Sequence, residues 1–190
     1  MADLIPGNLR MNIQLLVPEI SLEAIQSRNL CEIPEAINLE LVEVGEDGRE
    51  HLLVSAAASA WRELKAAALS DNVIVHIASA FRSVERQVAI VRHKLDTGMP
   101  IEEILKSCAP PGYSEHHSGR AVDVATPGHR VLDQQFAQTD AYAWLDKNAG
   151  RFGFLLSYPP GNRQGFLYEP WHWCYHAIDV PDGVANRTAA

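Results

Sequence analysis

The sequence predicts an α+β fold in which a small antiparallel sheet carries helices mainly on one of its sides. Two observations lead to this prediction. The clearest helical patterns come first along the chain, and short strand-like segments follow later, an order that is typical of α+β proteins. The chain has 190 residues, of which 47% are hydrophobic, so it is long enough to bury one sizeable core without disulfide bonds.

The first predicted elements are a hairpin and a long helix. Residues 37–44 alternate apolar and polar side chains, and the turn-forming residues 45–48 follow. This pattern indicates a strand that enters a hairpin, with residues 52–55 as the candidate partner strand. Residues 56–70 are rich in strong helix formers whose apolar side chains fall on one stripe, so we expect a helix there.

A strand and two shorter helices are predicted next. Residues 73–78 form a short β-branched run, which is typical of a mostly buried strand. Ser83 can cap a helix over residues 84–95, and residues 101–106 favour one or two further helical turns. The Pro-Pro-Gly sequence at 110–112 then ends the helical pattern, and a loop must follow.

The remaining elements are shorter. Residues 120–125 alternate like a strand, and residues 139–149 favour a helix with one apolar side. Residues 152–176 are rich in aromatic side chains and glycine, which indicates two short strands around a turn at 159–165.

Charge and hydropathy exclude several classes of partner. The formal net charge is -8, which disfavours binding to a nucleic acid backbone. No stretch has the ~20 apolar residues that a membrane-spanning helix needs, so we expect no membrane insertion. The chain begins without the pattern of a secretory leader, which favours the cytoplasm, or the periplasm if a leader has been removed. Nothing in the sequence indicates an oligomeric state.

Two short segments hold the residues with the clearest chemistry. Between Ser114 and Asp123 a histidine precedes an aspartate by seven positions, and Glu169 precedes His172 by three. Two imidazoles and one carboxylate are the ligands of an open catalytic zinc site, and a free glutamate beside the zinc-bound water could take its proton. Each segment taken alone fits hydrogen-bonded structure better. Positions three apart also face opposite sides of an ideal strand, so a turn must bring Glu169 and His172 together.

The order of the motifs resembles a known family. The pattern Ser-x-His-x-x-Gly-x-Ala-x-Asp over 114–123, followed by Glu-Pro-Trp-His over 169–172, is similar to that of the VanY-type D-alanyl-D-alanine carboxypeptidases. These belong to a wider zinc peptidase group that includes D-Ala-D-Ala dipeptidases, a murein endopeptidase, phage endolysins and the hedgehog domain. Ser-Ala-Phe-Arg-Ser over 79–83 also matches, and the resemblance covers residues 50 to 177.

The resemblance implies a role for each matching residue. It makes His116, Asp123 and His172 the ligands of one zinc ion, and Glu169 the general base. Arg82 would polarise the scissile carbonyl or hold a substrate carboxylate. The other predicted substrate contacts are Gln87, Ser114 and, in the pocket wall, Trp171. His117 is expected in an outer shell or on the surface, and Cys174 as a packed thiol.

The implied domain spans residues 37–180 as a zinc peptidase unit. It follows an N-terminal extension, residues 1–36, of unknown role, and precedes a tail, residues 181–190. The implied fold is that of the hedgehog and D-Ala-D-Ala peptidase group.

The implied function is removal of the terminal D-alanine from peptidoglycan stem peptides or their soluble precursors. L,D-carboxypeptidase activity on a tetrapeptide is slightly favoured over D,D-carboxypeptidase activity on a pentapeptide, because trimming cytoplasmic pentapeptide precursors would deplete the substrates of cross-linking. The alternatives are a dipeptidase or an endolysin-like endopeptidase and, in another class, a zinc-containing binding module without turnover.

Overall fold

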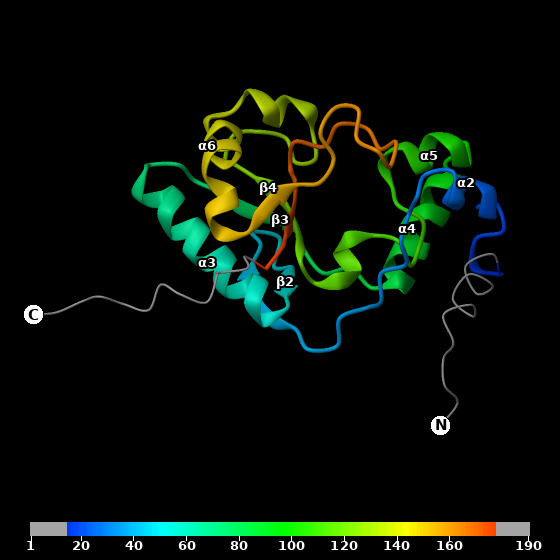
Figure 1. The fold of residues 1–190 in the computed structure, drawn as a ribbon, viewed down its shortest axis with the longest axis horizontal. Coiled ribbons are helices and arrows are strands. Elements are labelled where there is room, and N and C mark those ends of the chain that lie inside the picture. Colours follow the sequence, from blue (N-terminus) through cyan, green and yellow to red (C-terminus); the bar gives the residue numbers. More distant parts are fainter. Residues whose placement is uncertain (1–14, 178–190) are drawn as a thin grey trace, which may run out of the picture.

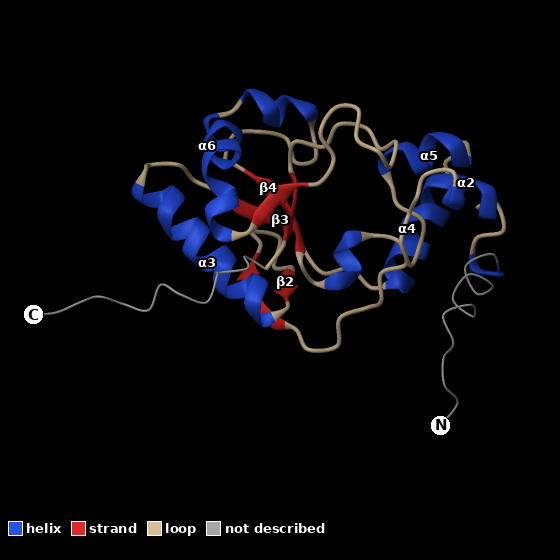
Figure 2. Ribbon diagram, in the orientation of Figure 1, coloured by secondary structure: helices blue, strands red, loops and turns tan. Residues whose placement is uncertain are grey.

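A computed structural model describes residues 15–177 of the chain (Figures 1 and 2). The helices that lie wholly within the described residues are α2 (Leu22–Gln26), α3 (Ser55–Ser70), α4 (Val84–Asp96), α5 (Ile101–Ser107) and α6 (Asp140–Asn148). Short 3-10 helices are η1 (Glu115–Ser118), η2 (Gln134–Gln138) and η3 (Ala149–Phe152). The strands are β1 (Glu40–Val44), β2 (Glu50–Leu53), β3 (His76–Ser79), β4 (Ala121–Ala125), β5 (Phe154–Leu156) and β6 (His172–Tyr175).

Two antiparallel sheets confirm the predicted α+β class. Strands β1 and β2 form a hairpin, and the other described strands form a four-stranded sheet in the order β3-β4-β6-β5. In the larger sheet β4 pairs with both β3 and β6, and Asp123 lies opposite His172 in the register. The centre of the sheet therefore brings together two segments that are far apart in the sequence.

The main hydrophobic core lies between this sheet and two helices, α3 and α6. Trp61 and Leu64 of α3, Leu145 of α6, and Val122 and Val124 of β4 are all buried in it. Because side chains alternate along a strand, Asp123 between the two valines faces the opposite side of the sheet. Figure 1 shows α3 and α6 on one side of the sheet and α2, α4 and α5 on the other.

A second core joins the N-terminal segment to α4 and α5. Val17, Ile20 and Ile25 are buried against Val91 of α4 and Ile104 of α5. The described part of the predicted extension is therefore packed into the fold. The rest of that extension, residues 1–14, and the predicted tail lie outside the described residues.

Three predicted boundaries shift for local reasons. The first strand begins at Glu40 rather than 37, and its partner ends at Leu53 because α3 already begins at Ser55. The strand predicted from 73 begins only at His76, because residues 72–73 close the end of α3. Asn72 adopts a left-handed conformation, with φ 59°, and the Val73 N–H donates to the Ala68 carbonyl oxygen at 2.8 Å.

Candidate metal centre

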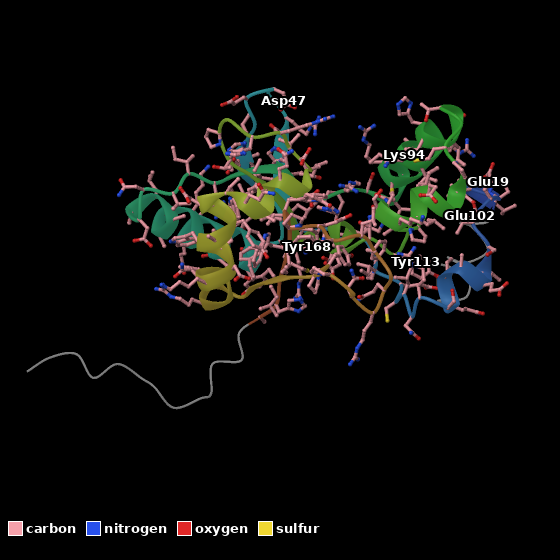
Figure 3. The ribbon with its side chains drawn as sticks, turned by 90° about the horizontal axis from the view of Figure 1, so that it is seen from above. Glu19, Asp47, Lys94, Glu102, Tyr113 and Tyr168 are labelled. Carbon is pink, nitrogen blue, oxygen red and sulfur yellow. The ribbon has the colours of Figure 1, made fainter. Side chains whose placement is uncertain are left out.

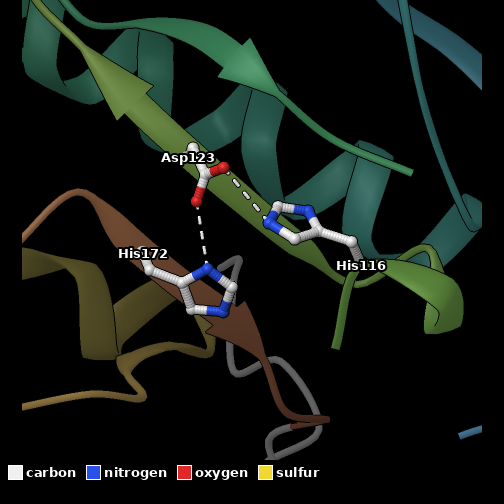
Figure 4. Close-up of side chains that lie close together, drawn as sticks. All are labelled: His116, Asp123 and His172. Carbon is white, nitrogen blue, oxygen red and sulfur yellow. Dashed lines mark hydrogen bonds and ion pairs between the residues drawn. The ribbon is translucent and has the colours of Figure 1, made fainter. Parts of the chain in front are cut away.

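Three elements place His116, Asp123 and His172 side by side (Figure 4). His116 lies on η1, Asp123 in the middle of β4 and His172 at the first position of β6. Gly119 ends η1 in a left-handed conformation, with φ 64°, and a Cβ there would lie 2.8 Å from Leu39 Cδ2. The glycine of the motif is therefore needed for the turn that carries the chain from His116 into β4.

The carboxylate of Asp123 lies between the two imidazoles. Its Oδ2 is 3.2 Å from Nε2 of His116, and its Oδ1 is 3.0 Å from Nδ1 of His172. The donor atoms of the three side chains all lie within 4.8 Å of one another, and all three residues are buried. Nδ1 of His116 lies 2.7 Å from the Ala80 carbonyl oxygen, so a proton on Nδ1 leaves Nε2 to face Asp123.

The charges of this cluster are strongly coupled. Burial alone would raise the pKa of Asp123, but the neighbouring imidazoles hold it well below its usual range. Burial alone would lower the pKa of His172, but its bonds to Asp123 and Glu115 raise it to about 10. In the metal-free protein a proton on His172 thus supplies the positive charge that the buried carboxylates require.

Glu169 reaches the same place through a turn. The backbone N–H of His172 donates to the Glu169 carbonyl oxygen at 3.1 Å, which closes a turn over residues 169–172 just before β6. This turn resolves the difficulty that positions three apart would face opposite sides of a strand. Burial raises the pKa of Glu169 to about 7, although the nearby His172 opposes the rise. A carboxyl group of this pKa can accept and release a proton near neutral pH.

Arg82 is fixed beside Asp123 by two side chains. Its NH1 donates to Oε1 of Gln87 at 3.0 Å, and its NH2 donates to Oγ of Ser79 at 3.0 Å and lies 3.7 Å from Oδ2 of Asp123. Gln87 is fully buried, and its amide also donates to the Ala109 carbonyl oxygen at 2.7 Å. The buried amide of Gln87 therefore fixes the position of the Arg82 guanidinium.

The predicted site residues other than Gln87 line one cavity of about 310 Å³. Its wall includes the three candidate metal ligands together with Arg82, Ser114, Glu169 and Trp171. Trp171 is half-buried in the cavity wall, directly before β6, whereas Trp173 is buried in the core. Two aromatic side chains, Tyr158 and Phe166, from the segment between β5 and β6 also line the cavity.

Glu115, which contacts one of the candidate ligands, is absent from the sequence-based prediction. Oε2 of Glu115 lies 2.9 Å from Nε2 of His172 and accepts a hydrogen bond from Oγ of Ser157 at 2.6 Å. The position of Glu115 directly before His116 in the motif was the available signal. Its contact with His172, however, depends on how η1 and β6 meet in space.

His117 and Cys174 lie behind the site. His117 was predicted in an outer shell or on the surface; it is fully buried, which excludes the surface and fits the outer shell. Its Nδ1 lies 2.6 Å from the Arg82 carbonyl oxygen, and its Nε2 accepts from the Gly112 N–H at 3.1 Å. It thereby ties the Arg82 loop to the loop before η1. Cys174 is buried as expected, and burial raises the pKa of its thiol.

The donor set fits a zinc ion. Two imidazole nitrogens and one carboxylate oxygen are the protein ligands of an open catalytic zinc site, which leaves a fourth position for water or substrate. The other nitrogen of each imidazole has an acceptor, the Ala80 carbonyl for His116 and the Glu115 carboxylate for His172. Such outer partners orient metal-binding histidines in general.

Comparison with known proteins identifies the family. The family model described as VanY, D-alanyl-D-alanine carboxypeptidase, matches residues 50–178. A D-alanyl-D-alanine carboxypeptidase of Enterococcus faecalis is 31% identical over 165 residues, which cover 82% of this chain and 59% of that protein. The chain thus spans less than two thirds of the length of this relative.

Two solved structures have similar folds. One is the LD-carboxypeptidase LdcB, a structure solved to explain peptidoglycan recognition. It superimposes with a TM-score of 0.66 at 28% identity, over 74% of this chain and 69% of LdcB. A mutant of the D,D-pentapeptidase VanY from the VanB-type resistance cassette, in complex with Zn(II), gives a TM-score of 0.63 at 30% identity, over 77% and 84% of the two chains. Because the family model covers most of the chain, including every candidate site residue, this protein belongs to the VanY family of D-alanyl-D-alanine carboxypeptidases.

Proposed function

We propose that this chain is a zinc-dependent carboxypeptidase that removes the terminal D-alanine from peptidoglycan stem peptides. The observation that carries the proposal is the position of Glu169. It lines the same cavity as the three candidate ligands and Arg82, and burial raises its pKa to about 7. A buried carboxyl group with a pKa near neutrality, beside a metal-binding triad, is suited to act as a general base.

His116, Asp123 and His172 would hold the ion. Zinc in such a site acts as a Lewis acid that activates water for attack on a carbonyl carbon. The protein supplies two neutral imidazoles and one carboxylate, so the site keeps a net positive charge when zinc is bound. Its position in a mostly buried cavity strengthens every electrostatic interaction there.

Glu169 would move the proton. Its carboxylate takes a proton from the attacking water as the water oxygen bonds to the scissile carbonyl carbon. It then gives that proton to the nitrogen of the leaving D-alanine as the carbon–nitrogen bond breaks. One water is consumed, and the products are free D-alanine and a stem peptide with a new carboxyl terminus.

Arg82 would stabilise the charge that develops on the scissile carbonyl oxygen. Its guanidinium is held by Gln87 and Ser79 beside Asp123, so little reorganisation is required when that charge appears. Ser114 and Trp171 line the cavity, and we propose that they contact the peptide.

Two stem peptides are candidate substrates. We propose the tetrapeptide first, in which D-alanine follows an L-centre, and the similarity to the LD-carboxypeptidase LdcB supports this choice. The pentapeptide that ends in D-Ala-D-Ala is second, and the Enterococcus faecalis relative supports it. A binding module without turnover would need no general base such as Glu169 in the cavity, so the position of Glu169 favours an enzyme.

Mass spectrometry of stem peptides tests the proposal. Zinc-loaded protein is incubated with tetrapeptide and pentapeptide stems, beside a sample treated with a chelator. We expect the tetrapeptide to lose one alanine in a chelator-sensitive reaction, while loss from the pentapeptide alone would assign D,D activity. Release of D-Ala-D-Ala or cleavage within the stem would indicate a dipeptidase or an endopeptidase. No chelator-sensitive change in either stem would contradict a peptidase role.

A further inference from the structure

Lys94 places a second cation in the wall of the catalytic cavity. It lies in the last turn of α4 and lines the same cavity as Arg82 and Glu169. Figure 3 shows the position of Lys94 at α4. Its ammonium is close enough to oppose the rise in the pKa of Glu169 and of Cys108 that burial causes. The charge of Lys94 therefore acts inside the cavity.

The ammonium of Lys94 has no partner among residues 15–177. Two of the other three lysines are neutralised locally: Nζ of Lys65 lies 2.8 Å from Glu43, and Nζ of Lys106 lies 2.6 Å from Glu103, while Lys147 is exposed. Lys94 is half-buried and has no such carboxylate within the described part of the chain. A half-buried ammonium in a cavity wall is available for a negatively charged group of a ligand.

The cavity wall contains few cationic side chains. The protein has a formal net charge of -8, and Asp123 and Glu169 add two carboxyl groups to the cavity wall. Of the described residues that line the cavity, only Arg82 and Lys94 are arginine or lysine. A stem peptide is an anion, so its binding depends on these local positive charges rather than on the overall field.

We propose that Lys94 forms a carboxylate subsite in the cavity, separate from the position of Arg82. This proposal rests on the proposed function and names a second feature that the substrate must carry. Arg82 is fixed next to Asp123, where the scissile carbonyl is expected, whereas Lys94 is free to bind a carboxylate elsewhere on the same peptide.

That carboxylate has two sources in stem peptides. One is the terminal carboxylate of the D-alanine that leaves. The other is the side-chain carboxylate of a diaminopimelate residue, which is missing when lysine occupies that position of the stem. Both sources offer the same chemistry to the ammonium, and two matched substrates distinguish them.

The test uses Lys94→Met, which keeps most of the aliphatic length of the side chain and removes its charge. The control is Lys147→Met, because Lys147 is exposed in the last turn of α6 and does not line the cavity. Both variants and the unchanged protein are assayed with a diaminopimelate tetrapeptide and a lysine tetrapeptide. A charge-assisted hydrogen bond predicts a loss of about 10- to 100-fold in kcat/KM for Lys94→Met.

The pattern of that loss identifies the carboxylate. An equal rise in KM for both stems means that Lys94 binds the terminal carboxylate. A loss at least about tenfold larger on the diaminopimelate stem means that it binds the side-chain carboxylate. If Lys94→Met and Lys147→Met both stay within about twofold of the unchanged protein on both stems, the subsite is refuted.

A binding measurement separates this proposal from the proposed function. Calorimetric titration of both stems into Glu169→Ala, with and without Lys94→Met, reads affinity without turnover. Equal affinities for the two variants would refute the subsite and leave the proposed function intact. Binding of neither stem by the Glu169→Ala protein would refute both.

Discussion

The carboxylate of Glu115 lies 2.9 Å from Nε2 of His172, so the residue directly before one candidate metal ligand holds the imidazole of another. The same carboxylate oxygen is held by Oγ of Ser157 at 2.6 Å. Because Glu115 accepts the Nε2 proton, Nδ1 is the nitrogen of His172 that can bind a metal beside Asp123. Glu115 is thus a positioning residue for the metal centre.

Glu115→Gln should weaken zinc binding by about 10- to 100-fold, because the amide accepts a weaker hydrogen bond and can present its NH₂ group to His172 instead. Competition with a zinc chelator measures the effect without any assay of activity. Ser157→Ala is the matched control, since it leaves the carboxylate in place, and we expect a smaller loss. Equal zinc affinity for Glu115→Gln and the unchanged protein would show that Glu115 does not position His172.

Glu169→Ala should lower kcat by roughly 10²- to 10⁴-fold. The only other carboxylate among the described residues that line the cavity is Asp123, which is a candidate metal ligand and so cannot replace Glu169 as the base. Zinc content should stay the same, since Glu169 is outside the donor set. His116→Ala is the contrasting variant and should lose the metal itself. Steady-state kinetics and metal analysis of both variants separate the two roles, and substantial activity in Glu169→Ala would remove it from the mechanism.

The candidate metal ligands were predicted from the resemblance of two ordered motifs, and the sheet explains the spacing of these motifs. Asp123 and His172 lie opposite each other in neighbouring strands, and the motif glycine, Gly119, returns His116 to the same face. Helices α3, α4 and α6 were also predictable. Each has a long apolar stripe or a capping side chain, such as Ser83 for α4 and Thr139 for α6.

Other features depend on contacts that no local pattern reveals. Helix α2 has only five residues, too few for a periodic signal. The sequence alone leaves open whether His117 is an outer-shell or a surface residue, because its contact with the backbone of Arg82 depends on the fold. The N-terminal segment matches no named motif, yet the N–H groups of Ile33 and Ala36 donate to the carbonyl oxygens of Gly112 and His117, which flank the candidate metal ligand His116.

Zinc affinity should rise with pH. Hydrogen bonds to two carboxylates raise the pKa of His172 to about 10 in the metal-free protein, so between pH 6 and pH 8 this side chain carries a proton that zinc must displace. One proton released per ion predicts a roughly tenfold gain in affinity for each pH unit. Chelator competition at pH 6, 7 and 8 measures the slope, and proton release in weak buffer provides a second readout. An affinity that does not change over this range would contradict the assignment of His172 as a ligand.

The same carboxylates should make the metal-free protein less stable at alkaline pH. The folded pKa of His172, about 10, lies above the ordinary value of 6.5, so its contribution to stability is fully present below pH ~6.5 and is lost as pH rises toward 10. Urea unfolding of the chelator-treated protein at pH 6 and pH 9 tests this sign. His172→Gln should remove that part of the pH dependence, and an unchanged slope in the variant would assign it to other groups.

Arg28 should link the N-terminal segment to the shape of the catalytic cavity. Its Nε donates to the Gln164 carbonyl oxygen at 2.6 Å, its NH1 donates to the Leu105 carbonyl oxygen at 2.7 Å, and its guanidinium lies 4.1 Å from the ring centre of Phe166. Phe166 lines the cavity. Arg28→Met should therefore raise KM with little change in kcat, and it should lower stability by about 2 kcal/mol, or Tm by roughly 4–8 °C.

Arg92→Met is the control for that variant, because Arg92 also binds the N-terminal segment through a backbone carbonyl, that of Leu16, but does not line the cavity. It should lower Tm less and leave KM unchanged, since its bonds are exposed. Thermal unfolding and kinetics on one stem peptide compare the two variants. If Arg28→Met lowers Tm and KM stays constant, the segment stabilises the fold without shaping the cavity. If KM rises equally in both variants, general loosening of the N-terminal segment explains the effect, and Arg28 has no specific role in holding Phe166.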